Sequence, residues 1–255
     1  MRIIISPAKK MNTDTDTLDY QDVPVFLEQT QQLMQYMQGL SYEECKYLWN
    51  CNDSIAKQNF LRLAHMNLES RLTPAILSYE GIQYQYMAPS VFEHSQYKYI
   101  QDHLRILSGF YGVLKPMDGI TPYRLEMQAK LAIHGCKNLY DYWKDKLYKE
   151  VLDDSRVIIN LASKEYSQCI EKYLQPEDTY ITCVFGEYDG KKVRQKGTYA
   201  KMARGEMVRF MAEYQIEEPE KLTEFNRLGY VYRKELSSET EYVFVTDVGW
   251  GYRNL

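Results

Sequence analysis

Apolar residues in this chain occur in short runs, alternating stretches and helically spaced sets, which together predict both strands and helices. The run before Pro7 contains three consecutive isoleucines and predicts a buried strand. Asp189-Gly190 lies between two alternating stretches and predicts a tight hairpin turn. A second hairpin is expected near residue 240. The expected strands cover residues 2–6, 123–131, 157–161, 180–188, 191–196, 230–234 and 242–246.

Apolar residues spaced three and four apart predict a series of helices. Ser41 and Glu44 have the spacing of a capping box, in which each side chain binds the backbone amide of the other residue, so a helix is expected to begin there. Thr73-Pro74 resembles an N-cap followed by proline, and Gly81 is expected to end that short helix. The other expected helices cover residues 25–38, 53–67, 95–107, 138–152, 163–173 and 199–215.

The order of these elements predicts the fold class. Helices and strands are interspersed without strict alternation, and no unit of about 20–50 residues repeats along the chain. No linker rich in glycine, serine or proline divides the sequence. We therefore expect one α+β domain over residues 1–255, with a mixed β-sheet flanked by helices.

The composition narrows the class of protein. Hydrophobic residues make up 45% and charged residues 26%, as in globular proteins. There are 24 tyrosines against 8 phenylalanines and 3 tryptophans, and tyrosine suits half-wet grooves as well as cores. The N-terminal apolar run is too short for a signal peptide, and no stretch approaches the roughly 20 apolar residues of a membrane span. A cytoplasmic location without a membrane partner is expected.

The spacing of cysteine and histidine predicts no metal site, and we expect no cofactor. The five cysteines are odd in number and contain no Cys-x-x-Cys, and the four histidines do not pair at i, i+4. Cys45 and Cys51 are candidates for sensing an oxidant, but nothing nearby marks either thiol as activated, which favours buried structural cysteines.

Positive charge is concentrated in one segment of an acidic chain. The net charge is −4, whereas residues 191–209 contain seven basic residues and one glutamate, so they carry +6 and leave −10 for the rest. On a helical wheel, Lys201, Arg204 and Arg209 surround Gly205 on the face opposite the apolar one. A glycine there could let a phosphate or another backbone approach closely, and the alternative is a solvated charged face with an incidental glycine.

A second segment, residues 104–116, combines basic residues with glycines. A helix is expected to run into a turn bounded by Gly109 and Gly112, whose exposed amides would attract an anion with the help of Arg105 and Lys115. A helix C-cap followed by an ordinary turn explains the same glycines.

Polar residues also follow the apolar strands, where sheets covered by helices bind ligands. After the expected strand at 2–6 these residues are Ser6 and Lys9, and after the expected strand at 157–161 they are Ser163, Lys164 and Glu165. On another expected strand, at 123–131, Arg124 and Glu126 would point to one face, either as an ion pair or as two groups lining a pocket.

These same stretches occur in this order in one protein family. They are SPAK (6–9), LRILSGFYGVLKP (104–116), PYRLEM (122–127), NLAS (160–163), YAKMARG (199–205) and FN (225–226). From residue 1 to about residue 245, the sequence resembles the YaaA-type peroxide-stress proteins. The resemblance implies a family-specific single-domain fold with a basic cleft and a helix-hairpin-helix element, whose hairpin corresponds here to residues 107–114.

The resemblance also implies DNA binding and a role in limiting damage by peroxide and intracellular iron. From the motif positions, we expect the nucleic-acid-binding residues to be Lys9, Arg105, Gly109, Gly112, Lys115, Arg124, Lys164, Lys201, Arg204 and Arg209. The expected partner is duplex or branched DNA, bound with low sequence specificity by a monomer. If about five cations engage phosphate, log K should fall with log salt with a slope of about −4 to −5.

An enzyme acting on a phosphorylated or nucleotide-like small molecule is the alternative. Its candidate catalytic residues are Glu126, Ser163 and Glu165, and Asn160 is a further polar group that DNA binding does not require. No recognised catalytic signature supports it. An enclosed pocket that holds a carboxylate would favour the enzyme, whereas a long open groove would favour DNA. An effect on iron is expected to be indirect, because no ready ligand set is present.

Overall fold

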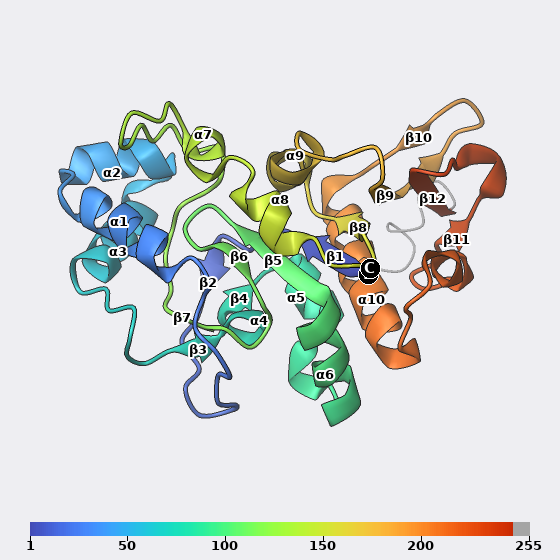
Figure 1. The fold of residues 1–255 in the computed structure, drawn as a ribbon, viewed down its shortest axis with the longest axis horizontal. Coiled ribbons are helices and arrows are strands. Elements are labelled where there is room, and N and C mark those ends of the chain that lie inside the picture. Colours follow the sequence, from blue (N-terminus) through green and yellow to red (C-terminus); the bar gives the residue numbers. More distant parts are fainter. Residues whose placement is uncertain (247–255) are drawn as a thin grey trace.

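The structure, a computed structural model, describes residues 1–246 and shows an α+β fold with a mixed sheet flanked by helices, as predicted (Figure 1). The strands are β1 (Arg2–Ile5), β2 (Lys10–Met11), β3 (Thr73–Pro74), β4 (Tyr79–Glu80), β5 (Leu104–Ser108), β6 (Gly112–Leu114), β7 (Gly119–Ile120), β8 (Val157–Leu161), β9 (Thr179–Tyr188), β10 (Val193–Arg194), β11 (Val231–Tyr232) and β12 (Glu241–Thr246). The helices are α1 (Leu27–Gln38), α2 (Tyr42–Trp49), α3 (Asp53–Ala64), α4 (Ala75–Ser78), α5 (Ile82–Met87), α6 (His94–His103), α7 (Leu139–Trp143), α8 (Lys146–Val151), α9 (Lys164–Glu171) and α10 (Gly197–Tyr214). Three 3-10 turns complete the set, η1 (Pro89–Val91), η2 (Pro219–Glu224) and η3 (Lys234–Leu236).

The main sheet has a parallel centre and antiparallel edges. Its order is β11-β12-β9-β8-β1-β5-β6, with β10 paired to β9. The five strands from β12 to β5 are parallel, whereas β6, β10 and β11 each pair antiparallel with a neighbour. The chain leaves β1 for β5 on one side and later returns to β8 on the other side. β1 and β8 therefore border the topological switch point, where parallel sheets commonly bind ligands beyond the strand carboxyl ends.

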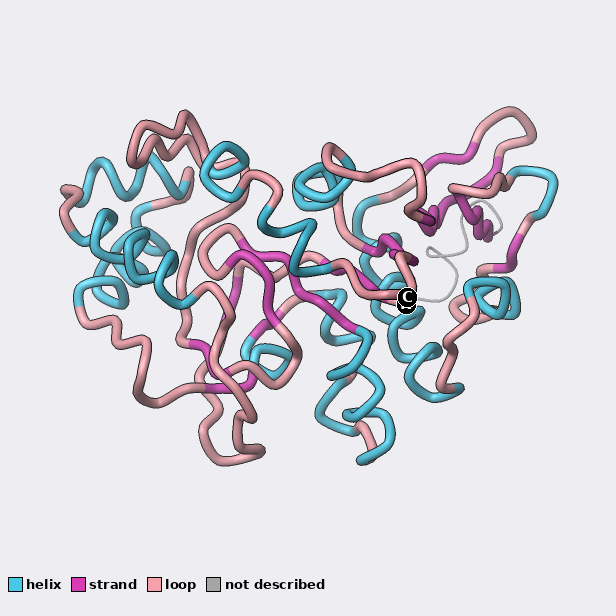
Figure 2. The backbone as a smooth tube through the Cα atoms, viewed as in Figure 1, coloured by secondary structure: helices cyan, strands magenta, loops and turns pink. Residues whose placement is uncertain are grey.

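Helices cover both faces of this sheet. Ile3, Ile4 and Ile5 point alternately to the two faces of β1, and all three are fully buried. One group of helices consists of α10, which packs along α5 and contacts α6 and β9. A second group consists of α8 and α9, which pack against each other, and α8 also contacts β6. The strands cross the middle of the molecule (Figure 2), and α1, α2 and α3 gather at the end opposite β11 and β12 (Figure 1).

Several local predictions are confirmed. Ser41 caps α2, since its hydroxyl accepts from the Glu44 amide and the Glu44 carboxylate accepts from the Ser41 amide. The turn at Asp189-Gly190 joins β9 to β10, and β11 pairs antiparallel with β12. The strands expected at 2–6 and 157–161 are β1 and β8. Among residues 1–246, no helix combines the length and the apolar character needed to cross a membrane.

The helix predicted through residue 107 is wrong after His103. Residues 104–108 form β5, which pairs with β1 on one side and with β6 on the other. A short apolar run fits a buried strand as well as a helix, and pairing with the distant β1 decides between them. The helix-hairpin-helix element whose hairpin was expected at residues 107–114 is not found at this place, since the segments on both sides of the turn are the paired strands β5 and β6.

Three other expectations need correction. Residues 138–152 form two helices, because Lys144 has φ +49° and ψ −132°, which a continuous helix cannot contain. Residues 123–131 bury alternate side chains as a strand would, but they pair with no strand among residues 1–246. Thr73-Pro74 is the short strand β3, and the helix that follows it spans only Ala75–Ser78.

Candidate functional site

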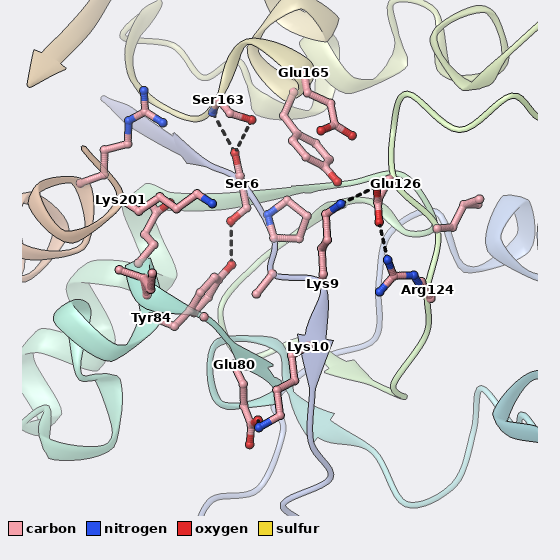
Figure 3. A pocket seen from close by; sticks show the side chains of 18 of the residues that line it. Ser6, Lys9, Lys10, Glu80, Tyr84, Arg124, Glu126, Ser163, Glu165 and Lys201 are labelled. Atoms are coloured by element: carbon pink, nitrogen blue, oxygen red, sulfur yellow. Dashed lines mark hydrogen bonds and ion pairs between the residues drawn. The ribbon is translucent and has the colours of Figure 1, made fainter. Parts of the chain in front are cut away.

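A cavity of about 400 Å³ lies beyond the carboxyl ends of β1 and β8, at the switch point of the sheet. Ser6 and Ser163 follow these two strands and meet across the gap. The Ser163 amide donates to Ser6 Oγ at 2.8 Å, and the two hydroxyls lie 3.2 Å apart. Tyr84 of α5 donates its hydroxyl to the Ser6 carbonyl at 3.0 Å (Figure 3). Ser163 occupies the N-cap position of α9, but its hydroxyl makes no capping bond.

The loop that carries Arg124 and Glu126 forms one wall of the cavity. Glu126 accepts from Lys9 Nζ at 2.9 Å through Oε2 and lies 3.1 Å from Arg124 Nη2 through Oε1 (Figure 3). The loop passes over the turn of the β5–β6 hairpin, and a Cβ on Gly109 would lie 2.6 Å from the Leu125 carbonyl oxygen. Gly109 is therefore needed for the close approach of this loop, and not for presenting amides to an anion.

The opposite wall is α10, which brings Lys201 and Arg204 to the cavity. This helix lies unusually close to α5, since a Cβ on Gly205 would meet the Gln83 carbonyl oxygen at 2.1 Å. The prediction that Gly205 admits a close neighbour is confirmed, and the neighbour is the backbone of α5. The close packing sets the distance between the α10 cations and the rest of the cavity.

Lys201 and Arg204 differ from most other basic residues of the cavity because neither has an acidic partner. Among residues 1–246, neither side chain makes an ion pair or a hydrogen bond. Burial lowers the pKa of the Arg204 guanidinium, although that group stays charged in proteins, and its Nε lies buried without a hydrogen-bond partner. An unpaired, partly buried guanidinium is a favourable place for an anion.

Glu165, in the first turn of α9, is the lining carboxylate that forms no ion pair with a described residue. Burial raises the pKa of Glu165. The Gln128 amide, which donates to Oε1 at 3.3 Å, opposes this shift, the nearby Glu126 adds to it, and the charge of Lys9 opposes it. No described residue forms an ion pair with Glu165, whereas both oxygens of Glu126 face cations. Two neighbouring carboxylates in different environments can divide the roles of proton carrier and fixed charge.

The lining carries a net positive charge. Five cations (Lys9, Lys10, Arg124, Lys201 and Arg204) and three carboxylates (Glu80, Glu126 and Glu165) line the cavity, which leaves +2. The ion pairs of Lys10 with Glu80 and of Glu126 with its two partners account for most of these charges. Outside those pairs remain the two α10 cations on one side and Glu165 on the other. Within residues 1–246, no group of three or more histidine, cysteine or carboxylate side chains is arranged to hold a metal ion.

The ten residues expected to bind nucleic acid do not gather in one cleft. Lys9, Arg124, Lys201 and Arg204 line the cavity, as do Ser163, Glu126 and Glu165 from the enzyme alternative. Six residues lie outside it: Arg105, Gly109, Gly112, Lys115, Lys164 and Arg209.

Each of these six residues is either buried or close to an acidic residue at another place in the fold. Arg105 is 5% exposed within β5, and burial lowers its pKa to about 10. Gly112 has φ +75° and packs against Trp143 in the hairpin turn. Lys164 pairs with Glu171, Arg209 pairs with Glu213 at 2.7 Å, and Lys115 lies 3.7 Å from Asp22. Arg209 and Glu213 have i, i+4 spacing on a helix, so their ion pair could have been predicted from the sequence.

Some lining residues were missed by sequence reasoning. Gln83 and Tyr84 line the cavity, and their helix α5 packs on α10. No local sequence pattern predicts that contact between the two helices. Tyr123 and Tyr166 also line the cavity. Asn160, in contrast, does not line it. Its amide donates to Thr182 and accepts from the Ala162 amide, so it supports the end of β8.

The fold and the cavity define a class of protein: an α+β protein with a ligand-sized cavity, cationic on balance, at the switch point of its parallel strands. Comparison with known sequences goes further. The family described as "Peroxide stress protein YaaA" matches residues 1–236. The chain therefore belongs to the YaaA peroxide-stress family, as the resemblance indicated.

Relatives named UPF0246 protein match along nearly their whole length. The one from Agathobacter rectalis is 63% identical over 244 residues, which cover 96% of this chain and 98% of the relative. The one from Lachnoclostridium phytofermentans is 57% identical over 245 residues, with 96% of each chain covered. The one from Pediococcus pentosaceus is 53% identical over 245 residues, covering 96% and 98%.

Proposed function

We propose that this peroxide-stress protein binds DNA through phosphate contacts at the cavity between β1 and β8. The observation that carries the proposal is the pair of α10 cations, Lys201 and Arg204, which line the cavity without an acidic partner among the described residues. Guanidinium and ammonium groups without a partner are the usual contacts for backbone phosphates, and such contacts need no particular base sequence.

The ion pairs of the other basic residues limit how many phosphates the protein can neutralise. Lys9 and Arg124 share Glu126, while Lys164 and Arg209 have acidic partners of their own. A cation that must leave a carboxylate to meet a phosphate gains little. With about two effective contacts, the salt slope of log K should be about −2, and not the −4 to −5 expected for five.

The test is fluorescence anisotropy of a labelled four-way junction and a matched duplex at several salt concentrations. The double variant Lys201→Ala/Arg204→Ala should weaken binding and flatten the slope by about 2 units. Lys164→Ala is the matched control, because it removes an exposed lysine that lies outside the cavity and is paired with Glu171. Equal losses in the control and the double variant, or no binding by the native protein at low salt, would contradict the proposal.

An enzyme acting on a phosphorylated or nucleotide-like molecule is a second candidate, and the form of the site favours it. The cavity is ligand-sized and holds a carboxylate, Glu165, whose pKa is raised by burial. In this function Lys201 and Arg204 would hold the phosphate, and Glu165 would carry a proton. Phosphorylated metabolites incubated with the protein should yield a product by mass spectrometry, and Glu165→Gln should abolish turnover. Finding no product from any compound would leave this candidate without support.

A further inference from the structure

The unpaired charges of the cavity lie at two separate ends. Lys201 approaches Ser6 from one side, while Glu165 and Glu126 lie on the other side (Figure 3). Glu126 is held between Lys9 and Arg124, so Glu165 is the carboxylate left without an ion pair among the described residues. A ligand that satisfies both ends needs an anionic group at one end and hydrogen-bond donors at the other.

The walls between these ends are partly apolar. Tyr84, Tyr123 and Tyr166 line the cavity. All three are at most 6% exposed, and Tyr123 stacks on Phe110 with ring centroids 4.9 Å apart, so they form a rigid, packed wall and not a free stacking platform. An apolar wall between polar ends suits a ligand whose middle part is a flat, weakly hydrated ring.

The size of the cavity limits how much nucleic acid can enter. A volume of about 400 Å³ lies near the lower end of the range for ligand pockets, roughly 300–1,000 Å³. One nucleotide unit therefore fits this description better than a stacked base pair. Gln83 adds an unused donor to the wall, since it is 7% exposed and its amide nitrogen has no hydrogen-bond partner among residues 1–246.

We propose that the cavity receives a single nucleotide with an amino-bearing base. Its phosphate lies on Lys201 and Arg204, and the exocyclic amino group of adenine, cytosine or guanine donates to Glu165. The nucleotide comes either from DNA, as an unpaired residue that leaves the stack, or from a free nucleotide. The inference rests on the phosphate contacts of the proposed function and adds to them a selection for the base.

The first experiment uses free mononucleotides, titrated calorimetrically. dAMP, dCMP and dGMP should bind about tenfold more tightly than dTMP, which lacks the amino group. Glu165→Ala should remove this preference, because alanine has no side-chain acceptor for the amino group, whereas Lys201→Ala/Arg204→Ala should weaken all four nucleotides by a similar factor. Glu171→Ala, on the same helix but outside the cavity, is the control and should leave the preference intact. Equal binding of all four nucleotides by the native protein would overturn the inference.

The second experiment separates the two sources. Labelled duplexes with one bulged deoxyadenosine or one bulged thymidine are compared with a fully paired duplex by anisotropy. Tighter binding of the bulged deoxyadenosine, lost in Glu165→Ala, supports entry of a DNA nucleotide. DNA binding that needs Lys201 and Arg204 but ignores the bulged base would overturn the inference and leave the proposed function standing. Selective mononucleotide binding without DNA binding would overturn DNA as the partner and assign the site to free nucleotides.

Discussion

Replacing Gly205 by alanine tests how closely α10 packs on α5. The new Cβ would lie 2.1 Å from the Gln83 carbonyl oxygen and 2.9 Å from the Met87 amide nitrogen. Both atoms belong to the backbone of α5, so no side chain can rotate away to make room. Ordinary contact begins at 3.4 Å, which means that the two helices must separate by about 1 Å at this point.

Two opposing effects set the size of the change. Alanine is favoured over glycine inside a helix by about 1 kcal/mol, and forcing a methyl group into a filled space costs about 1–3 kcal/mol, occasionally more. Because the clash is with backbone, we expect the cost at the upper end of that range. The free energy of unfolding should fall by about 2 kcal/mol, and the melting temperature by roughly 4–8 °C.

Urea and thermal unfolding measure this change, with Gly197→Ala as the matched control. Gly197 begins the same helix, and a Cβ there meets nothing within 4 Å. The control should be neutral or slightly stabilising, because only helix propensity acts on it. A Gly205→Ala protein as stable as the control would refute the close packing of α10 on α5. It would also remove the reason given for the position of Lys201 and Arg204.

Two further predictions concern a helix cap and a buried acid. Ser41→Ala removes the side chain that caps α2, so the free energy of unfolding should fall by about 1 kcal/mol in urea titrations, and an unchanged midpoint would contradict the cap. Burial raises the pKa of Asp118 from 3.8 to about 7, so the folded protein holds this proton more tightly than the unfolded chain does. Stability from this group is therefore present below about pH 4 and is lost as the pH rises to about 7. Asp118→Asn should remove that part of the decline and be more stable than the native protein at pH 8, by up to about 4 kcal/mol. Urea unfolding at pH 5 and pH 8 measures the difference, and the same pH dependence in both proteins would show that Asp118 is not the group responsible.

Much of the local structure could be predicted because it depends on residues that are close in sequence. The cap at Ser41 depends on Glu44 three residues later, and the turn at Asp189-Gly190 depends on two residues that tolerate its backbone angles. The helix predicted at 199–215 is present as α10 for the same reason, since its apolar face repeats at helical spacing.

Where a segment's structure depends on residues far away in the sequence, its local pattern was not enough to predict that structure. Residues 104–108 form a strand because β1, about one hundred residues earlier, lies beside them, and the same apolar residues would also suit a helix. Arg105 and Lys201 look alike in sequence as basic residues near apolar ones. Only the fold shows that Arg105 is buried within the sheet and that Lys201 faces a cavity.

By itself, the sequence determined the residue types at the ends of β1 and β8, the basic residues of α10 and membership of the YaaA family, since each depends on order along the chain. The tertiary structure alone decided that β1 and β8 are neighbours, so that Ser6 and Ser163 meet across 157 positions of sequence. It also decided which charges are neutralised. A carboxylate cancels a cation only when the two lie within a few ångströms, and folding sets that distance.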